Sequence, residues 1–137
     1  MKSFLNVPKK VQYGLMLVSH LANHEQAGGQ PVSLDVVADV LKVSQGFLEE
    51  IAGDLRRAGL IVGRRGRVGG YVLAKEANGI TVYDIVVATH GPVTMAECAT
   101  VRKDFSVWGV VQDRMVETLT SVTVAEFARH MPLYGRK

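Results

Sequence analysis

The sequence has a single cysteine among its 137 residues and no long apolar run. With Cys98 alone, an intrachain disulfide is excluded. A membrane-spanning helix needs roughly 18 or more consecutive apolar residues, and no stretch of this chain approaches that length. The first residues, MKSFLNVPKKVQ, lack the apolar core of a signal peptide. These absences predict a cytoplasmic protein with no membrane partner.

Acidic residues are missing between positions 55 and 75. This local absence is more informative about possible binding partners than the net charge of +3. Within the segment, glycines alternate with arginines in the stretch GRRGRVGGY, residues 63–71. Glycine lets the backbone approach an anion closely, and a one-signed segment builds a local positive potential. We therefore expect an anion-facing surface here rather than an ordinary solvated face. The basic residues of the segment are Arg56, Arg57, Arg64, Arg65, Arg67 and Lys75.

Apolar spacing predicts that most of the chain is helical. Hydrophobic residues recur at helical intervals over residues 9–25. Ser33 and Ser44 are expected to cap two short helices, residues 34–42 and 45–58, which a tight break separates. The apolar face of the first short helix is expected to consist of Val36, Val37, Val40 and Leu41.

The pattern then changes to that of strands. LIV at 60–62 and YVLA at 71–74 are short runs rich in β-forming residues, and the Gly/Arg stretch joins them as a hairpin. Gly59 stands where a left-handed residue would end the preceding helix. Two short helices followed by a hairpin with a basic tip predict an α+β, mostly α, winged helix-turn-helix fold.

The same glycines have a rival interpretation as a loop that holds a nucleotide. A dinucleotide-binding loop has the spacing G-x-G-x-x-G and opens into a helix, and a P-loop ends in Gly-Lys-Ser/Thr. This stretch ends Gly-Gly-Tyr and leads into an expected strand. We therefore interpret it as a wing whose arginines contact duplex phosphates or enter the minor groove. Tyr71 is expected to begin the return strand and to pack inward.

Helical spacing returns after the hairpin. Thr81 is expected to cap a helix that ends at Gly91, with Asp84 completing a partial capping box. The apolar spacing over residues 105–122 predicts a long helix, and Thr123 and Glu126 are expected to form a capping box for a last short one. The long helix carries an apolar stripe that we expect to join two subunits. This stripe consists of Trp108, Val111, Met115, Leu119 and Val122.

We divide the chain into three parts on this basis. Residues 1–91 form the winged helix-turn-helix DNA-binding domain. Residues 92–104 form an irregular effector or sensor loop, and residues 105–137 hold the dimerisation helix and the final short helix.

Four motifs then carry a family resemblance. They are S-x-x-F-L-E at the start of the second short helix, L-R-R-A-G-L-I at its end, R-G-x-x-G-G-Y-x-L in the wing and I-T-V-Y-D-I after it. From Tyr13 to Gly91, and weakly over LTSVTVAEFAR, the chain resembles the Rrf-two (Rrf2) family of bacterial winged-helix transcription regulators. The family includes the regulator of iron–sulfur-cluster assembly, the nitric-oxide-sensitive repressor and the repressor of cysteine metabolism.

The resemblance implies a homodimeric, sequence-specific DNA-binding transcription regulator, expected to be a repressor, and not an enzyme. Family members bind palindromic double-stranded DNA operators and dimerise through the long C-terminal helix. A winged-helix module that binds an acidic protein is the alternative, because arginines also suit an acidic partner.

The resemblance also suggests which residues contact DNA. The start of the second short helix would reach base edges, with Glu49 accepting a hydrogen bond from a cytosine amino group. Favourable placement in a first helical turn is the competing explanation for Glu49 and Glu50. Arg65 matches the wing arginine that enters the minor groove, and Arg67 stands in place of a common proline. The candidate DNA-contacting residues are Ser44, Gln45, Gly46, Glu49, Glu50, Arg56, Arg57, Arg64, Arg65, Arg67, Gly69 and Gly70.

Many family members hold an iron–sulfur cluster through three cysteines, and Cys98 matches the first of these positions. One cysteine excludes a three-cysteine cluster, so we expect no cofactor. A cluster completed by Glu, His or the partner subunit is one alternative. A redox-sensing thiol is another, since Arg102 and Lys103 would lower its pKa, although Glu97 would oppose this. An inert, packed thiol is the favoured interpretation.

His20 and His24 lie four residues apart on one helical face, a spacing that can hold a metal ion. No third ligand accompanies them in a recognisable motif, so we expect surface or packing roles and no metal site. No histidine or aspartate motif supports a catalytic role for the cysteine either.

Overall fold

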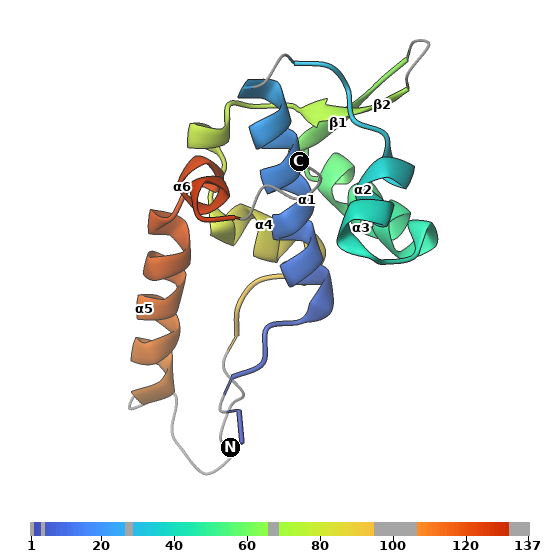
Figure 1. Cartoon of the computed structure of the whole chain (residues 1–137). Helices are drawn as coiled ribbons and strands as arrows, with labels where there is room; N and C mark the ends of the chain where they lie inside the picture. Colours follow the sequence, from blue (N-terminus) through green and yellow to red (C-terminus); the bar gives the residue numbers. More distant parts are fainter. Residues whose placement is uncertain (1, 4, 27–28, 66–68, 95–106, 132–137) are drawn as a thin grey trace.

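The computed structural model describes residues 2–3, 5–26, 29–65, 69–94 and 107–131 of the chain. A two-stranded antiparallel sheet lies at one end of a set of helices, and α1 runs through the middle of them (Figure 1). The elements in order are α1 (Lys9–Gln26), α2 (Leu34–Leu41), α3 (Gln45–Arg57), β1 (Ile61–Arg64), β2 (Gly70–Leu73), the 3-10 helix η1 (Ala77–Gly79), α4 (Val82–Thr89), α5 (Val107–Ser121) and α6 (Val124–Arg129).

The helix-turn-helix is formed by α2 and α3. Lys42 ends α2 in the left-handed conformation, with φ of 60°. The hydroxyl of Ser44 then accepts a hydrogen bond from the backbone N–H of Phe47 at 3.1 Å, which confirms the predicted cap of α3. Ser33 precedes α2 in extended conformation, but its side chain makes no such capping bond.

The predicted apolar face of α2 is wrong in part. Val37 and Leu41 are buried as expected, whereas Val36 is 51% exposed. Leu34 and Ala38 take its place in the core. These residues lie at spacings of three and four around Val37 and Leu41, so the buried stripe is rotated toward Leu34.

The predicted hairpin is confirmed, with Ile61 opposite Leu73 and Arg64 opposite Gly70. Gly59 has a φ of +77°, as a left-handed helix end requires. A third short segment, which the sequence did not predict, pairs with the other edge of β2. The backbone N–H of Val32 donates to the carbonyl of Tyr71 at 3.0 Å, and the N–H of Tyr71 donates back at 2.8 Å. The wing is thereby anchored to the chain just before α2.

Gly70 is required where these two segments meet. A Cβ at this position would lie 2.5 Å from the carbonyl carbon and oxygen of Val32, and backbone atoms cannot move aside cheaply. Gly70→Ala should therefore lower the free energy of unfolding by ~1–3 kcal/mol, as measured by urea denaturation. Gly79→Ala is the matched control, because no heavy atom lies within 4 Å of its added Cβ. Equal stability of the two variants would contradict this account.

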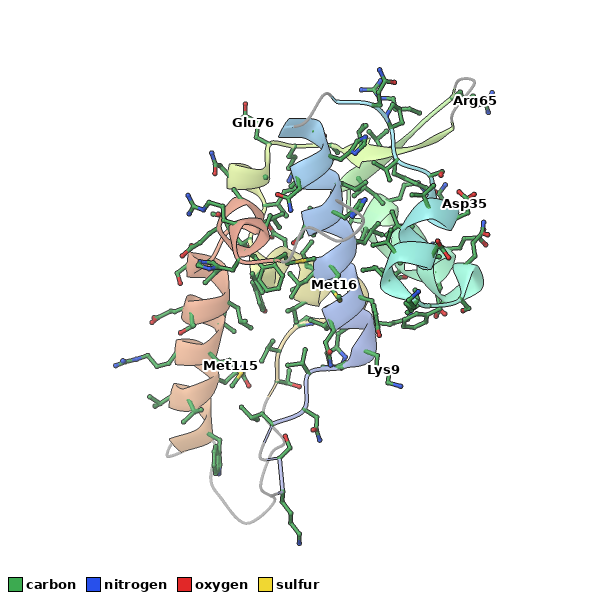
Figure 2. All side chains as sticks on the ribbon, in the orientation of Figure 1. Lys9, Met16, Asp35, Arg65, Glu76 and Met115 are labelled. Atoms are coloured by element: carbon green, nitrogen blue, oxygen red, sulfur yellow. The ribbon has the colours of Figure 1, made fainter. Side chains whose placement is uncertain are left out.

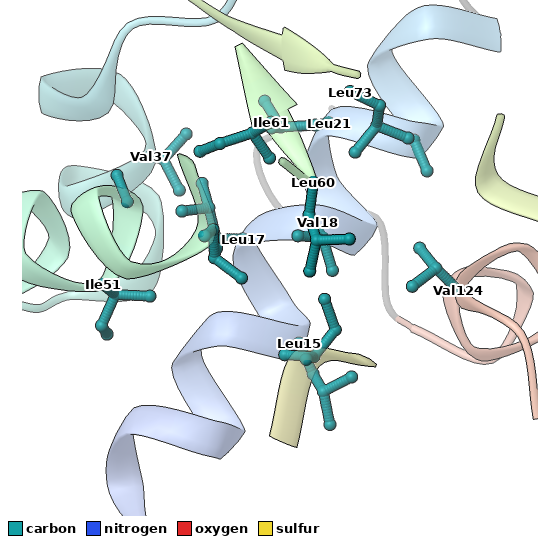
Figure 3. Close-up of a cluster of buried hydrophobic side chains, with 14 of the residues drawn as sticks. Leu15, Leu17, Val18, Leu21, Val37, Ile51, Leu60, Ile61, Leu73 and Val124 are labelled. Carbon is teal, nitrogen blue, oxygen red and sulfur yellow. The ribbon is translucent and has the colours of Figure 1, made fainter. Parts of the chain in front are cut away.

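One hydrophobic core joins the helices to the sheet. The buried side chains labelled in Figure 3 come from α1, α2, α3, the two strands, the residue before β1, and α6. α6 is included because Val124 is fully buried and Ala128 is 4% exposed. The backbone N–H of Val124 also donates to the carbonyl of Ile80 at 2.7 Å. The last short helix thus packs in the core of the winged helix.

α4 begins with the expected capping box. The backbone N–H of Asp84 donates to the Thr81 hydroxyl at 3.1 Å, and the Asp84 carboxylate accepts from the N–H of Thr81 at 2.9 Å. At α6 the Thr123 hydroxyl accepts a hydrogen bond from the backbone N–H of Glu126 at 3.1 Å, which forms one half of the predicted capping box. Among the described residues, no helix is long and apolar enough to cross a membrane.

α5 differs from the other helices in how it packs. Its C-terminal end lies against α4, and its N-terminal end projects beyond the body of the protein (Figure 1). Leu119 and Val122 accordingly pack against the core, whereas Trp108 is 42% exposed and Val111 is 36% exposed. One end of the predicted apolar stripe therefore packs against the core of the same chain, and the other end is exposed.

Candidate nucleic-acid interface

The buried face of α3 fixes which residues this helix presents to solvent. Leu48, Ile51 and Leu55 are fully buried. Gln45 and Glu49, near the start of the helix, are exposed, and the Gln45 amide donates to the Glu49 carboxylate at 3.3 Å. Both side chains, together with the exposed Ser44 and Gly46, lie on the N-terminal turns that in a helix-turn-helix reach base edges.

Glu50 lies toward α1, where Lys10 places a cation beside its carboxylate. The ammonium of Lys10 lies 2.8 Å from the Glu50 carboxylate and 3.2 Å from that of Asp54. Asp54 also pairs with Arg57, one turn further along α3, at 2.5 Å. Hydrogen bonds to Glu50 and then to Asp54 raise the pKa of Lys10 above its ordinary value. This chain of ion pairs links α1 to α3 and engages both carboxylates.

Lys10 is a residue that the sequence analysis missed. It lies 44 residues from Asp54 in the chain, so no local pattern relates the two side chains. A lysine in the first turn of a helix is in fact unfavourably placed with respect to the helix dipole. Only the packing of α1 against α3 reveals its role.

The arginines of the wing are held clear of the body of the protein. Arg64 ends β1, and Arg65 follows it at the start of the tip, where Figure 2 shows it far from the core. Both side chains are exposed, and the backbone of Gly69 across the tip is exposed as well. Arg67 lies outside the described residues. The hairpin therefore presents Arg64 and Arg65 as a projecting cationic edge.

These arginines are not neutralised by neighbouring carboxylates. Within the described ranges, no acidic side chain forms an ion pair with Arg56, Arg64 or Arg65. Arg57 is the exception, since Asp54 holds it. Unpaired guanidinium groups at the surface create the positive potential that attracts phosphate.

The two histidines on α1 whose spacing could hold a metal ion lie side by side. The rings of His20 and His24 are stacked with centroids 6.5 Å apart. Partial burial, and to a lesser extent the neighbouring His24, lowers the pKa of His20. No group of three or more His, Cys, Asp or Glu side chains suited to a metal lies within the part of the chain that the structure describes. Cys98 falls outside that part.

Comparisons with known proteins agree with this geometry. The Rrf2 family model, described as an iron-dependent transcriptional regulator, matches residues 7–130. The HTH-type transcriptional regulator CymR of Bacillus subtilis is 32% identical over 128 residues, which cover 92% of this chain and 91% of CymR. The solved structure of B. subtilis CymR, the global cysteine regulator, aligns with a TM-score of 0.82 over 94% of this chain and 100% of the CymR chain, at 32% identity. That of T. potens IscR aligns with a TM-score of 0.76 and 34% identity, over 94% and 93% of the two chains.

Proposed function

Because this chain belongs to the Rrf2 family of transcriptional regulators, we propose that it is a homodimeric repressor that recognises a palindromic operator. It is a DNA-binding transcription regulator and not an enzyme. Regulation of this kind takes place at the chromosome, so we assign the protein to the bacterial cytoplasm. The observation that carries the proposal is the exposed start of α3 together with a wing whose Arg64 and Arg65 pair with no acidic side chain of the described residues.

In our proposal the two surfaces have different tasks. Arg64 and Arg65 of the wing contact phosphates or enter the minor groove, which fixes the position of the protein on the duplex. The first turns of α3 enter the major groove and read base edges. Gly69, which is exposed at the tip of the wing, leaves room for close approach of the duplex backbone. Gly70 faces the backbone of Val32 instead, so its contribution to the interface would be to hold the wing in place.

Glu49 is a better candidate for base readout than Glu50. The Glu50 carboxylate is occupied by Lys10 at 2.8 Å, so it would have to leave an ion pair in order to reach DNA. Among the described residues, Glu49 is held by the Gln45 amide alone, at 3.3 Å, and both residues are exposed. A carboxylate in this position is suited to accept from a cytosine amino group.

We expect Glu49→Ala to relax the preference at one or two base pairs of each half-site. Discrimination at a matched base pair amounts to ~1–3 kcal/mol, so the preference there should fall about fivefold or more. Selection from a random-duplex library with both proteins measures this directly. Gln12→Ala is the control, because Gln12 is an exposed polar residue like Glu49 but lies on α1. Its amide donates to the carbonyl of Val7 within the same part of the chain. Identical selected sequences for parent and Glu49→Ala would remove Glu49 from the readout.

The uncovered end of α5 supports a dimer. Trp108 and Val111 are exposed apolar residues on the half of the stripe that projects beyond the body of the protein. Large apolar side chains of this kind are enriched at subunit interfaces. We propose that they pack against the same helix of a second copy, and that Met115 contributes from the next turn.

The family description mentions iron, but the donor set of this chain does not fit a three-cysteine cluster, since the sequence holds one cysteine. We propose that the protein regulates transcription without such a cluster. Protein purified without oxygen should then be colourless, with no absorbance between 300 and 700 nm, and iron analysis should find no stoichiometric iron. A brown sample would show instead that a cluster is completed by other ligands, and Cys98→Ser would then bleach it.

The rival function is a winged-helix module whose arginines bind an acidic protein. DNA binding through phosphate contacts predicts that log K falls by about 0.9 per contact for each tenfold rise in salt concentration. Enrichment of a palindrome from a random-duplex library, with this salt dependence, supports the operator-binding proposal. Failure to enrich any sequence would favour the protein partner.

A further inference from the structure

A hollow of about 480 Å³ lies on the protein between the end of α3, the base of the wing and α4. Arg57 and Lys75 contribute to its walls, together with Tyr83 of α4. Leu60, which is 3% exposed, and Ala88 provide apolar surface. Sites for small organic molecules have volumes of roughly 300–1,000 Å³ and combine apolar walls with a few polar groups. The hollow therefore has the size and composition of a small-molecule site.

The charged side chains around the hollow differ in whether they already have partners within the protein. Two carboxylates, those of Asp54 and Asp84, line it. Asp54 is already paired with Lys10 and Arg57, and Asp84 accepts the N–H of Thr81 in the capping box. In contrast, no acidic side chain among the described residues pairs with the exposed Lys75. A ligand that enters the hollow would thus meet the unpaired cation of Lys75. Of the two carboxylates there, Asp54 is held by two cations, and Asp84 has no cationic partner among the described residues but lies at the N-terminus of α4, where the helix dipole partly offsets its charge.

We propose that this hollow binds a small organic carboxylate. The carboxylate group would lie between the Lys75 ammonium and the guanidinium of Arg57, and the apolar part would rest on Leu60, Ala88 and the ring of Tyr83. The Arg57 guanidinium can bind Asp54 and the ligand at the same time, because it has five N–H donors. In the structure one of its nitrogens, Nη2, donates to Asp54, which leaves other N–H groups for the ligand. Charge-assisted bonds of this type are about twice as strong as neutral ones.

An occupant would be positioned to affect the recognition helix. Arg57 is joined through Asp54 to Lys10, and Lys10 to Glu50, the neighbour of Glu49 on α3. A ligand carboxylate that shares the Arg57 guanidinium with Asp54 would weaken the Arg57–Asp54 pair, and Asp54 would then hold Lys10 of α1 more strongly. This regulatory consequence rests on the proposed function, whereas binding itself does not.

The binding test uses the whole DNA-free protein and benzoate as the probe, followed by amide chemical-shift changes in NMR. We expect saturable shifts around Leu60 and Ala88, with one benzoate per chain. Benzamide, which has the same shape without the charge, and inorganic phosphate, which has charge without an apolar part, should each bind at least about tenfold more weakly. Hexanoate repeats the experiment with an aliphatic body.

Two variants test the location. Lys75→Gln should weaken benzoate binding about tenfold or more, whereas Lys9→Gln, an exposed lysine at the start of α1, should not change it. Val87 lines the hollow and is 39% exposed, so Val87→Glu should fold and abolish binding by repelling the carboxylate. Val36→Glu, on exposed α2 surface, is its matched control.

The proposal is overturned if neither benzoate nor hexanoate gives saturable shifts, if benzamide or phosphate binds as well as benzoate, or if Lys75→Gln and Val87→Glu leave binding unchanged. A second measurement, operator affinity with and without saturating benzoate, tests the regulatory consequence separately. Because benzoate binding is measured without DNA, failure to find an operator would not affect the result.

Discussion

Replacing Arg64 and Arg65 together with alanine is expected to reduce affinity for duplex DNA on the order of 100-fold. Each arginine is exposed at the wing and forms no ion pair with an acidic residue of the described chain, so neither has a structural partner to lose. Each would contribute a hydrogen bond to a phosphate, and the proposed dimer carries four such arginines. A net contribution of about 0.7 kcal/mol for each of the four contacts accounts for a loss of this size. Fluorescence anisotropy with a labelled operator measures it.

The same double variant should have a shallower salt dependence. The proposed dimer would lose two phosphate contacts from each subunit, so the slope of log K against log salt should fall by about 3.6, or about 0.9 for each contact. The thermal unfolding midpoint should stay unchanged, because the two guanidinium groups lie in solvent. Arg129→Ala is the matched control, since Arg129 is also exposed but lies on α6, at a different part of the surface from the wing. An unchanged affinity and slope in the wing variant would exclude the wing from the DNA interface.

The second large effect is expected on α5. Trp108→Asp should convert the proposed dimer into a monomer and lower affinity for the proposed palindromic operator on the order of 100-fold or more. In a dimer, binding of one subunit to its half-site holds the other subunit close to the second half-site. The second subunit then binds at a high effective concentration, and a monomer loses this gain in affinity. Aspartate in the first turn of a helix is favourable, and Trp108 is 42% exposed, so the chain itself should remain folded.

Analytical ultracentrifugation and operator titration measure these two effects. Val110→Asp provides the control, because Val110 is 59% exposed and lies on the opposite side of α5 from the apolar stripe. It should leave both the dimer and the affinity intact. If Trp108→Asp remains a dimer with parental affinity, α5 is not the subunit interface.

Much of the fold follows from local features of the sequence. Ser44 caps α3, Gly59 takes a left-handed conformation and Thr81 forms a capping box with Asp84, as predicted. Each of these depends on residues within four positions of one another, so the sequence contains all the information needed. The hairpin was predictable for the same reason, because its two strands are adjacent in the chain. The family motifs fall on these same locally determined elements.

The candidate site was only partly predictable. The exposed start of α3 and the basic wing follow from periodicity and charge, and the structure presents both to solvent. The pattern of residues alone could not separate Glu49 from Glu50, since both stand in the first turns of one helix, and only the family resemblance favoured Glu49. The distinction comes from Lys10, which reaches Glu50 from α1.

The sequence by itself determined the type, order and ends of most elements, and the basic character of the wing. Tertiary structure alone decided that Val36 faces solvent, that Val32 adds a third segment beside β2, and that Val124 completes the core. It also decided how far the apolar stripe of α5 is covered. Capping, turns and helical periodicity act over a few neighbouring residues, whereas these contacts join residues that are far apart in the chain. Their energies depend on how the elements pack, which no short stretch of sequence specifies.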